Sequence, residues 1–496
     1  MKRFPIIRSK LSVWTLAAAL LAGAWPTSVL AAEAGSQTSA GTTAETVDPS
    51  VAQLNQVYGL IENYHVSGIN KDKLSEAAIE GMVKALGDPY TVYMNAEEWK
   101  QFNNSLEQNY VGIGIRLVQD DSGYFIGQVF DGSPAASAGL QRGDYIESVE
   151  GQPLANGNIS AVVQKVTGPA GTNVRIGIRR GGETLEKQVV RKQINVPVVT
   201  SRYFEGGIGY IGLTSFSHDA DEQFAAQLLA LKNKGLKSLI IDLRGNPGGL
   251  LETAGNIARE FIQEGVLIHT KDRNNVDEPV KLTNGKKLDI PLYVLIDENS
   301  ASASEVLTGA LQDYKLATVI GTKSFGKGSV QNIFNLSGGA VLKLTIEEYL
   351  TPNKRPVNKV GLTPDIEVQG VLPQLIAALF SAGLGQTALT IEKTHVTING
   401  QEFNEIVRVL RENGHVYAPS RLLASLIGGQ IAWNEATGAV EVWKGADRLT
   451  FSGQEGAMKM ESGTSYIELG AFARAFPELS FSDNEEKLTM TVQKGS

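Results

Sequence analysis

Between residues 208 and 321 the chain alternates strand and helix patterns, and this rhythm limits its fold more than any other feature. Apolar, β-prone runs occupy 208–214, 237–243, 290–296 and 317–321, and segments with helical spacing lie between them at 219–234, 251–263 and 303–314. Such alternation predicts βαβ units and a mainly parallel sheet covered by helices. Sites in such sheets lie at the carboxyl ends of the strands, so we expect the chemistry in the loops after residues 243 and 296.

Residues 1–32 have the pattern of a secretory signal. Basic residues open the chain, a mostly apolar stretch covers 11–24, and small residues suited to signal peptidase follow, which predicts cleavage after Ala31 or Ala32. An uncleaved membrane anchor is the alternative, although the apolar run is shorter than the ~20 residues that a membrane span needs. Residues 33–48 are predicted to be a flexible linker. We therefore expect a secreted or cell-envelope protein.

Composition excludes several functions. Removal of the signal takes the formal net charge from −8 to −12, because four basic residues are lost, so nucleic-acid binding is not expected. The chain has no cysteine, which rules out disulfides, a thiol nucleophile and cysteine-ligated metals. Its five histidines form no metal-spaced pair, and we predict no metal site and no cofactor.

The candidate nucleophile and base are Ser302 and Lys327, 25 residues apart. Ser302 lies where an apolar strand turns into a helix, and the free backbone N–H groups and helix dipole there favour an alkoxide or oxyanion. A serine hydroxyl needs a base to take its proton, and a lysine can do this only when neutral. Since the ordinary pKa of lysine is about 10.4, Lys327 needs a pKa lower by roughly 3, which burial beside Phe325 and Val330 can supply.

Simpler interpretations of these motifs have to be weighed. Serine-rich strand-to-helix corners are often only helix caps, and Gly-Lys-Gly is often only an exposed turn. Residues 321–327 also satisfy the first seven positions of a phosphate-binding P-loop, but the eighth, which should carry the hydroxyl that holds Mg²⁺, is Gly328. We reject nucleotide binding on that residue, and we interpret His218 as a helix-start residue and not as a member of a triad.

Three motifs together resemble the C-terminal processing peptidases, also called tail-specific proteases. The motifs are Asp242-Leu-Arg-Gly-Asn-Pro-Gly-Gly249, Asn299-Ser-Ala-Ser-Ala-Ser-Glu305 and Ser324-Phe-Gly-Lys-Gly-Ser-Val-Gln331. The resemblance covers roughly residues 50–370. One departure is Lys354, which stands where the family usually has glycine and bears on a local turn only.

By this resemblance Ser302 is the nucleophile, Lys327 is the general base and Gln331 orients the lysine. Spacing alone does not distinguish Ser302 from Ser300 or Ser304, so that choice depends on the family.

The resemblance also implies an oxyanion hole. Its donors would be the backbone N–H of Ala303 and that of a glycine in the Asn246-Pro-Gly-Gly249 turn, which we align as Gly248, with Gly249 as the alternative. Glycines allow close approach of the backbone to a ligand, whereas the simpler interpretation is an ordinary strand-ending turn. Losing one such donor typically costs ~10²–10³ in rate.

Residues 97–191 resemble a PDZ domain inserted before the protease core. Gly112, Ile113, Gly114 and Ile115 form its candidate carboxylate-binding loop, because glycines free backbone N–H groups to hold a chain-terminal carboxylate. An extended peptide can then pair with the adjoining strand edge. A small β-domain without a ligand is the simpler interpretation. Beside a protease we expect this domain to bind substrate tails that end in an apolar residue and to gate the active site.

The remaining segments are helical before the PDZ domain and duplicated after the core. Residues 49–96 carry two apolar helical stripes, and the resemblance allows homodimerisation through them. Residues 389–496 repeat a strand–helix–hairpin pattern, with Tyr417 and Tyr466 49 residues apart. They resemble the copper amine oxidase N-terminal-like domain of secreted Gram-positive proteins but have no metal-ligand cluster. We expect no copper there and interpret them as an envelope-binding or interaction module.

Together these patterns predict a multidomain α/β protein: N-terminal helices, an inserted PDZ β-domain, an α/β core at 192–370, a linker at 371–388 and a duplicated α+β domain. The predicted function is a secreted serine endopeptidase that cleaves protein or peptide substrates near accessible C-termini. A non-catalytic PDZ scaffold of the cell envelope is the alternative, and a substituted dyad would favour it. Ser302 and Lys327 are both present.

Overall fold

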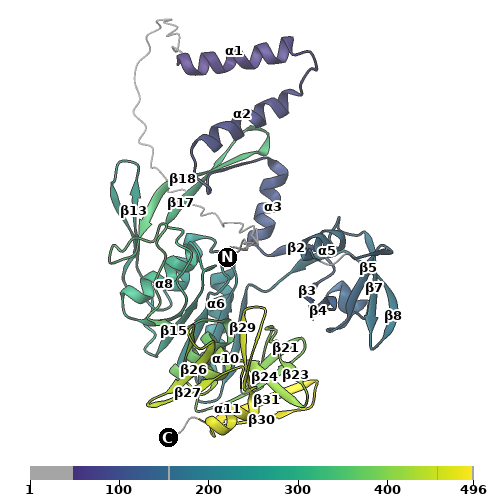
Figure 1. Ribbon diagram of the computed structural model, residues 1–496. Coiled ribbons are helices and arrows are strands. Elements are labelled where there is room, and N and C mark those ends of the chain that lie inside the picture. Colours follow the sequence, from purple (N-terminus) through teal and green to yellow (C-terminus); the bar gives the residue numbers. More distant parts are fainter. Residues whose placement is uncertain (1–47, 155–156, 455, 494–496) are drawn as a thin grey trace, which may run out of the picture. The chain divides into compact units, whose positions relative to one another are not determined.

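The computed structural model describes residues 48–154, 157–454 and 456–493 (Figure 1). The predicted signal peptide at 1–32 and the linker up to residue 47 lie outside the described residues. The described chain divides into two compact units, one made of 101–329 with 348–493 and the other of 48–100 with 330–347. No helix within the described residues is long and apolar enough to cross a bilayer.

A six-stranded sheet forms the centre of the first unit. Its strands, in spatial order, are β10 (Val199–Phe204), β11 (Ile208–Leu213), β12 (Ser238–Asp242), β15 (Leu292–Ile296), β16 (Ala317–Gly321) and β19 (Ile366–Glu367). β10 is antiparallel to β11, and the other neighbours are parallel. Every residue of β11 and β12 is buried, as expected of parallel strands covered on both faces. The helices between these strands are α6 (Ala220–Asn233), α7 (Leu251–Ala258) and α8 (Ala303–Asp313). The sheet is therefore mainly parallel, as the alternation predicts.

The protease core and the C-terminal domain share one hydrophobic core. The range 371–388, predicted as a linker, contains α9 (Val371–Ser381), in which Leu375, Ile376 and Leu379 are buried. The same apolar cluster includes Ile240 of the central sheet and Leu423 of the C-terminal domain. The segment is not the predicted linker, because its apolar residues are buried between the central sheet and the C-terminal domain. It is a packed helix and not a free connection.

The C-terminal domain contains the predicted duplication. The first copy consists of β23 (Leu410–Glu412), β24 (His415–Pro419), α10 (Ser420–Leu426), β25 (Gln430–Asn434) and β26 (Ala439–Lys444). The second copy has the same order, with β28 (Met458–Glu461), β29 (Thr464–Glu468), α11 (Leu469–Ala475), β30 (Leu479–Asp483) and β31 (Lys487–Gln493). The copies meet where β24 pairs with β29. β20 (Gln386–Glu392) pairs with β31, and β21 (His395–Ile398) and β22 (Gln401–Phe403) continue that sheet. β27 (Asp447–Phe451) pairs with β26 of the first copy.

The PDZ domain has its own sheet and core. Its elements are β3 (Ile115–Asp120), β4 (Gly123–Val129), α4 (Pro134–Ser137), β5 (Tyr145–Val149), β6 (Gln152–Pro153), α5 (Ile159–Val166), β7 (Asn173–Arg180) and β8 (Glu183–Val190). A separate two-stranded ribbon of β2 (Asn109–Gly112) and β9 (Lys192–Asn195) closes it at the base. Both chain connections of the domain therefore pass through this ribbon, and α3 (Ala96–Leu106) precedes it.

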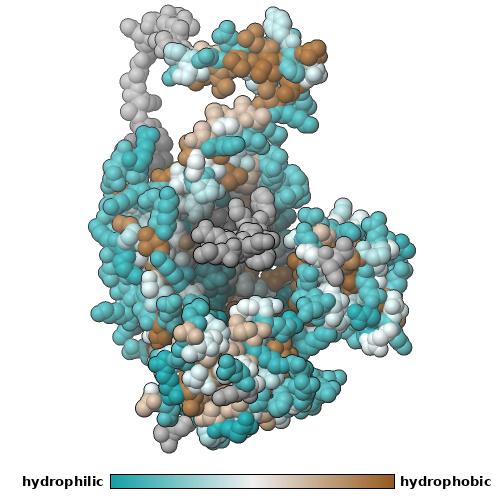
Figure 2. Space-filling view, viewed as in Figure 1, coloured by the Kyte–Doolittle hydropathy of each residue, from teal (hydrophilic) through white to brown (hydrophobic). Residues whose placement is uncertain are grey.

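The second unit joins the N-terminal segment to two later strands. Its elements are α1 (Pro49–Tyr64), α2 (Lys71–Ala85), β1 (Val92–Met94), most of β17 (Ser329–Asn335) and most of β18 (Val341–Leu350), which pairs with both β1 and β17. Neither α1 nor α2 buries any residue. Figure 2 shows apolar side chains gathered along these helices, among them Leu54, Leu60 and Met82.

Candidate active site

Ser302 adopts a strained backbone at the start of α8. Its φ is 54° and its ψ is −117°, and only 1% of its surface is exposed. Positive φ is uncommon for a residue with a side chain, and such strain persists where the surroundings enforce it, commonly at active sites.

The neighbouring serines, Ser300 and Ser304, donate their hydroxyl protons to backbone carbonyls of the segment that follows β12. Ser300 Oγ donates to the carbonyl oxygen of Leu243 at 2.8 Å, and Ser304 Oγ donates to that of Asn246 at 2.9 Å. A hydroxyl has one proton to donate, so both side chains serve to anchor the loop. These contacts, with the backbone strain, favour Ser302 over Ser300 and Ser304, which spacing alone could not do.

One buried carboxylate holds the segments of Ser302 and Lys327 by their backbones. Glu305 Oε2 accepts the N–H of Ser302 at 3.0 Å and the N–H of Lys327 at 2.8 Å. Its other oxygen accepts the N–H of Gly326 at 2.7 Å and the hydroxyl of Ser324. Burial raises the pKa of Glu305 above its ordinary value, and the hydrogen bonds from these donors oppose that rise. The carboxylate therefore joins the loop that carries Ser302 to the loop that carries Lys327.

Tyr349 makes a second link between the same segments. Its buried hydroxyl donates to the carbonyl oxygen of Lys327 at 2.8 Å and lies 3.2 Å from that of Ser302. Lys327 itself is 1% exposed, which is the burial that a neutral lysine requires.

The Asn246–Gly249 turn packs directly against the serine loop. A Cβ atom on Gly248 would lie 2.8 Å from Ser302 Cβ and 2.9 Å from the Ala303 nitrogen, so only glycine fits there. The Gly248 N–H donates to Asn246 Oδ1 at 2.8 Å, whereas Gly249 packs against the backbone of Phe216.

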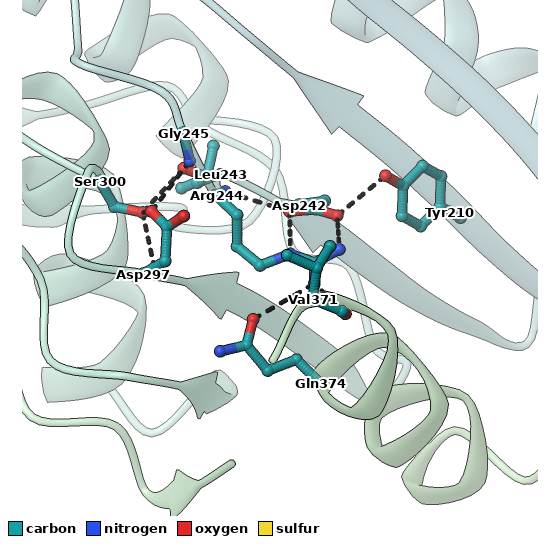
Figure 3. Close-up of polar contacts among 9 residues, drawn as sticks. All are labelled: Tyr210, Asp242, Leu243, Arg244, Gly245, Asp297, Ser300, Val371 and Gln374. Atoms are coloured by element: carbon teal, nitrogen blue, oxygen red, sulfur yellow. Dashed lines mark hydrogen bonds and ion pairs between the residues drawn. The ribbon is translucent and has the colours of Figure 1, made fainter. Parts of the chain in front are cut away.

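A buried ion pair anchors the strand that leads into this turn (Figure 3). Arg244 Nε donates to Asp242 Oδ1 at 2.8 Å, and Tyr210 donates to Asp242 Oδ2 at 2.9 Å. Arg244 also donates to Gln374 Oε1 at 3.2 Å and to the carbonyl of Val371 in α9. Burial, followed by the charge of Asp242, raises the pKa of Tyr210, which stays a neutral donor. The turn is thus held by contacts with α9.

Gln331 lies on β17 in the second unit and is 1% exposed. Its Nε2 donates to Thr345 Oγ1 on β18 at 3.2 Å. Sequence analysis identified Gln331 but not Thr345, because nothing local to either residue indicates which strands pair.

The predicted PDZ loop lines a pocket of about 180 Å³. Gly112, Ile113, Gly114 and Ile115 all border it, together with Val163 and Val166 of α5. The Ile113 side chain is buried in the domain core, so its backbone is the part that can reach a ligand.

Glu305 and Tyr349 are site residues that sequence analysis missed. A signal for Glu305 was present, since Ser302-Ala-Ser-Glu305 has the S-x-x-E spacing of a helix capping box. Within the described ranges, no group of three or more His, Asp or Glu side chains is arranged to hold a metal ion.

Comparisons with known proteins match this architecture. Residues 207–368 match the family model described as Peptidase family S41, and 125–180 match a PDZ domain. Residues 20–98 match the Activating protease CtpB N-terminal domain, and 376–442 match the Copper amine oxidase N-terminal domain.

Similarity to curated proteins shows which family the chain belongs to. The chain is 35% identical over 328 residues to the carboxy-terminal processing protease CtpB of Bacillus subtilis, covering 65% of this chain and 68% of that protein. It is 34% identical over 327 residues to a "Probable CtpA-like serine protease" of Staphylococcus aureus, covering 65% and 66%. The solved photosystem II D1 C-terminal processing protease is 25% identical, with a TM-score of 0.41, over 65% of this chain and 94% of that one. The chain belongs to the C-terminal processing peptidases of family S41, which are serine-type peptidases.

Proposed function

We propose that this protein is an exported serine endopeptidase that cleaves substrates near their C-termini, with Ser302 as nucleophile and Lys327 as general base. The observation that carries the proposal is the shared oxygen of Glu305, which accepts the backbone N–H groups of both residues although they are 25 apart in sequence. Burial of both side chains and the strained backbone of Ser302 support the same roles.

In this mechanism Ser302 Oγ attacks the carbonyl carbon of the scissile peptide while neutral Lys327 Nζ takes its proton. The backbone N–H of Ala303 and that of Gly248 stabilise the resulting oxyanion. Lys327 then returns the proton to the leaving amine as the C–N bond breaks. Water, activated by Lys327 in the same way, hydrolyses the acyl-enzyme.

The Gly248 N–H changes partner in this scheme. In the structure it donates to Asn246 Oδ1, so oxyanion binding requires that side chain to release it. Gly249 remains the alternative donor.

The PDZ domain would deliver the substrate tail. Its 180 Å³ pocket is lined by apolar side chains such as Ile115, Val163 and Val166, which suit an apolar C-terminal residue beside the carboxylate-binding loop. The exposed apolar faces of α1 and α2 support a homodimer, and contact of the C-terminal domain with the cell envelope remains a prediction.

The test is cleavage of an unstructured peptide with a free, apolar C-terminus, followed by mass spectrometry. Wild-type protein should cut it, Ser302→Ala and Lys327→Ala should not, and Lys323→Ala, which changes an exposed lysine of the same loop, should behave as wild type. Activity in Ser302→Ala or Lys327→Ala would overturn the proposal. Comparison of envelope protein termini in cells with wild-type and Ser302→Ala protein would then identify substrates.

A further inference from the structure

A partly buried polar chain leads from Gln331 to the N-terminal segment, entirely within the second unit. Gln331 Nε2 donates to Thr345 Oγ1 at 3.2 Å, and the Thr345 N–H donates to Thr91 Oγ1 at 3.1 Å. The Thr91 hydroxyl in turn donates to Asp88 Oδ2 at 2.6 Å. The chain therefore crosses from β17 through β18 to the turn that separates α2 from β1.

Asp88 is the acceptor at the end of this chain. Although burial would raise the pKa of Asp88, hydrogen bonds from the hydroxyls of Thr345 and Thr91 and from the backbone of Tyr90 and Thr91 hold it below its ordinary value. Asp88 is therefore ionised at neutral pH, and an ionised carboxylate can only accept hydrogen bonds. Both threonine hydroxyls must then point their protons at Asp88.

This direction decides how the amide of Gln331 is oriented. The two ends of a glutamine amide differ only in their hydrogen bonding, so the partners choose which end faces which side. Because the Thr345 proton is used by Asp88, its oxygen can only accept, and it selects the NH₂ end of Gln331. The oxygen Oε1 is then the end turned away from Thr345. The ammonium that forms when a lysine takes up a proton needs that oxygen if Gln331 is to hold it, because an ammonium can only donate.

We propose that Thr345, oriented by Asp88 and Thr91, is a positioning residue that fixes which end of the Gln331 amide is turned away from β18. This inference rests on the proposed function, and on the role of orienting the general base that the family resemblance implies for Gln331. The exposed helices α1 and α2 lie directly before the Asp88–Thr91 turn in the chain.

The experiment compares substitutions at Thr345 in the full chain. Thr345→Val removes the hydroxyl but keeps the branched shape that suits a strand, and Thr345→Ser keeps the hydroxyl. Thr345→Val should lower kcat by about 10- to 100-fold with little change in KM, and Thr345→Ser should restore most of it. Asp88→Asn should give a similar loss, because an amide can donate and no longer fixes the direction of the chain.

Thr390→Val is the matched control. Thr390 is a buried strand threonine of the C-terminal domain whose hydroxyl lies 3.2 Å from that of Thr489. It should leave kcat unchanged. The profile of kcat/KM against pH should shift to lower pH in Thr345→Val but not in Thr390→Val, because an amide oxygen stabilises an ammonium more than a neutral amine. Thermal melting of each variant shows that the fold persists.

The double variant separates failure of this inference from failure of the proposed function. If Gln331→Ala loses activity and Thr345→Val adds no further loss in that background, the two act as one unit, as expected. Full activity of Gln331→Ala would overturn the role of Gln331 itself. If Gln331→Ala loses activity but Thr345→Val keeps the wild-type kcat and pH profile, only the positioning role of Thr345 is overturned. The same conclusion follows if Thr345→Ser is as impaired as Thr345→Val.

Discussion

The carboxylate of Glu305 accepts the backbone N–H of Lys327 at 2.8 Å across 22 residues of sequence. Because the same oxygen also accepts the N–H of Ser302, the relative position of the Ser302 and Lys327 segments depends on one side chain. Glu305 is not placed to transfer a proton to substrate by these contacts. Its four donors instead give it the role of an anchor.

Glu305→Gln should therefore damage both the site and the fold. A glutamine has one acceptor oxygen, and its NH₂ group would face N–H donors that have lost their partner. We expect kcat to fall by about 100-fold or more, and the free energy of unfolding in urea to fall by about 1–3 kcal/mol. Glu298→Gln, an exposed change nearby, is the control, and equal behaviour of the two variants would contradict the anchor role.

Lys327→Arg should be as inactive as Lys327→Ala. A guanidinium stays protonated at any workable pH and cannot accept the proton of Ser302. The double variant Ser302→Ala/Lys327→Ala should be no slower than either single variant, since the two residues act as a unit. Single-turnover cleavage rates measure this, and additive losses would show that the residues act independently.

Substrates with a free C-terminus should be cleaved faster than the same chains with an amidated C-terminus. The PDZ loop from Gly112 to Ile115 is proposed to hold a carboxylate, and amidation removes its charge. Cleavage rates of the two chains by wild-type protein and by protein lacking the PDZ domain provide the measurement. Equal rates in the wild type would exclude carboxylate recognition. Unchanged activity after deletion would exclude gating.

Lys343→Met should stabilise the protein below about pH 8. Burial lowers the pKa of Lys343 from 10.5 to about 8, against the attraction of Asp88. Between these values the unfolded chain binds more protons than the folded one, so wild-type stability rises with pH in that window, and below it the full penalty applies. The gain should be roughly 3 kcal/mol at pH 7 and should disappear as pH approaches 10.5.

Melting temperatures of Lys343→Met and wild type across pH 6–10 test this. Lys281→Met changes an exposed strand lysine and should show no such dependence. A Lys343→Met variant less stable than wild type at every pH would show that the lysine stabilises the fold.

Leu379→Ala should weaken the protease core as well as the C-terminal domain. Leu379 of α9 is fully buried in the cluster that the two share, and a cavity there costs about 2–5 kcal/mol. Both regions should unfold in one transition at lower urea, as followed by hydrogen exchange. Val371→Ala, at an exposed position of the same helix, is the control. Loss of protection in the C-terminal domain alone would contradict the shared core.

The sequence by itself determined most elements of the central sheet and the family. Local periodicity predicts four of its six strands, β11, β12, β15 and β16, within a residue or two, because burial on both faces leaves continuous apolar runs such as β11 and β12. The duplication after residue 389 is visible for the same reason. The three motifs identify the family, since residue types around a nucleophile are constrained position by position.

Only the tertiary structure decided which of these residues meet. The links from Glu305 to Lys327 and from Gln331 through Thr345 to Asp88 join segments that no local pattern connects, because strand pairing and loop packing set them. The helix α9 shows the same limit: an apolar segment after a proteolytic core suggests a linker until its two buried faces are seen. Periodicity in the sequence predicts that a residue is buried. Which residues it packs against depends on the folded chain.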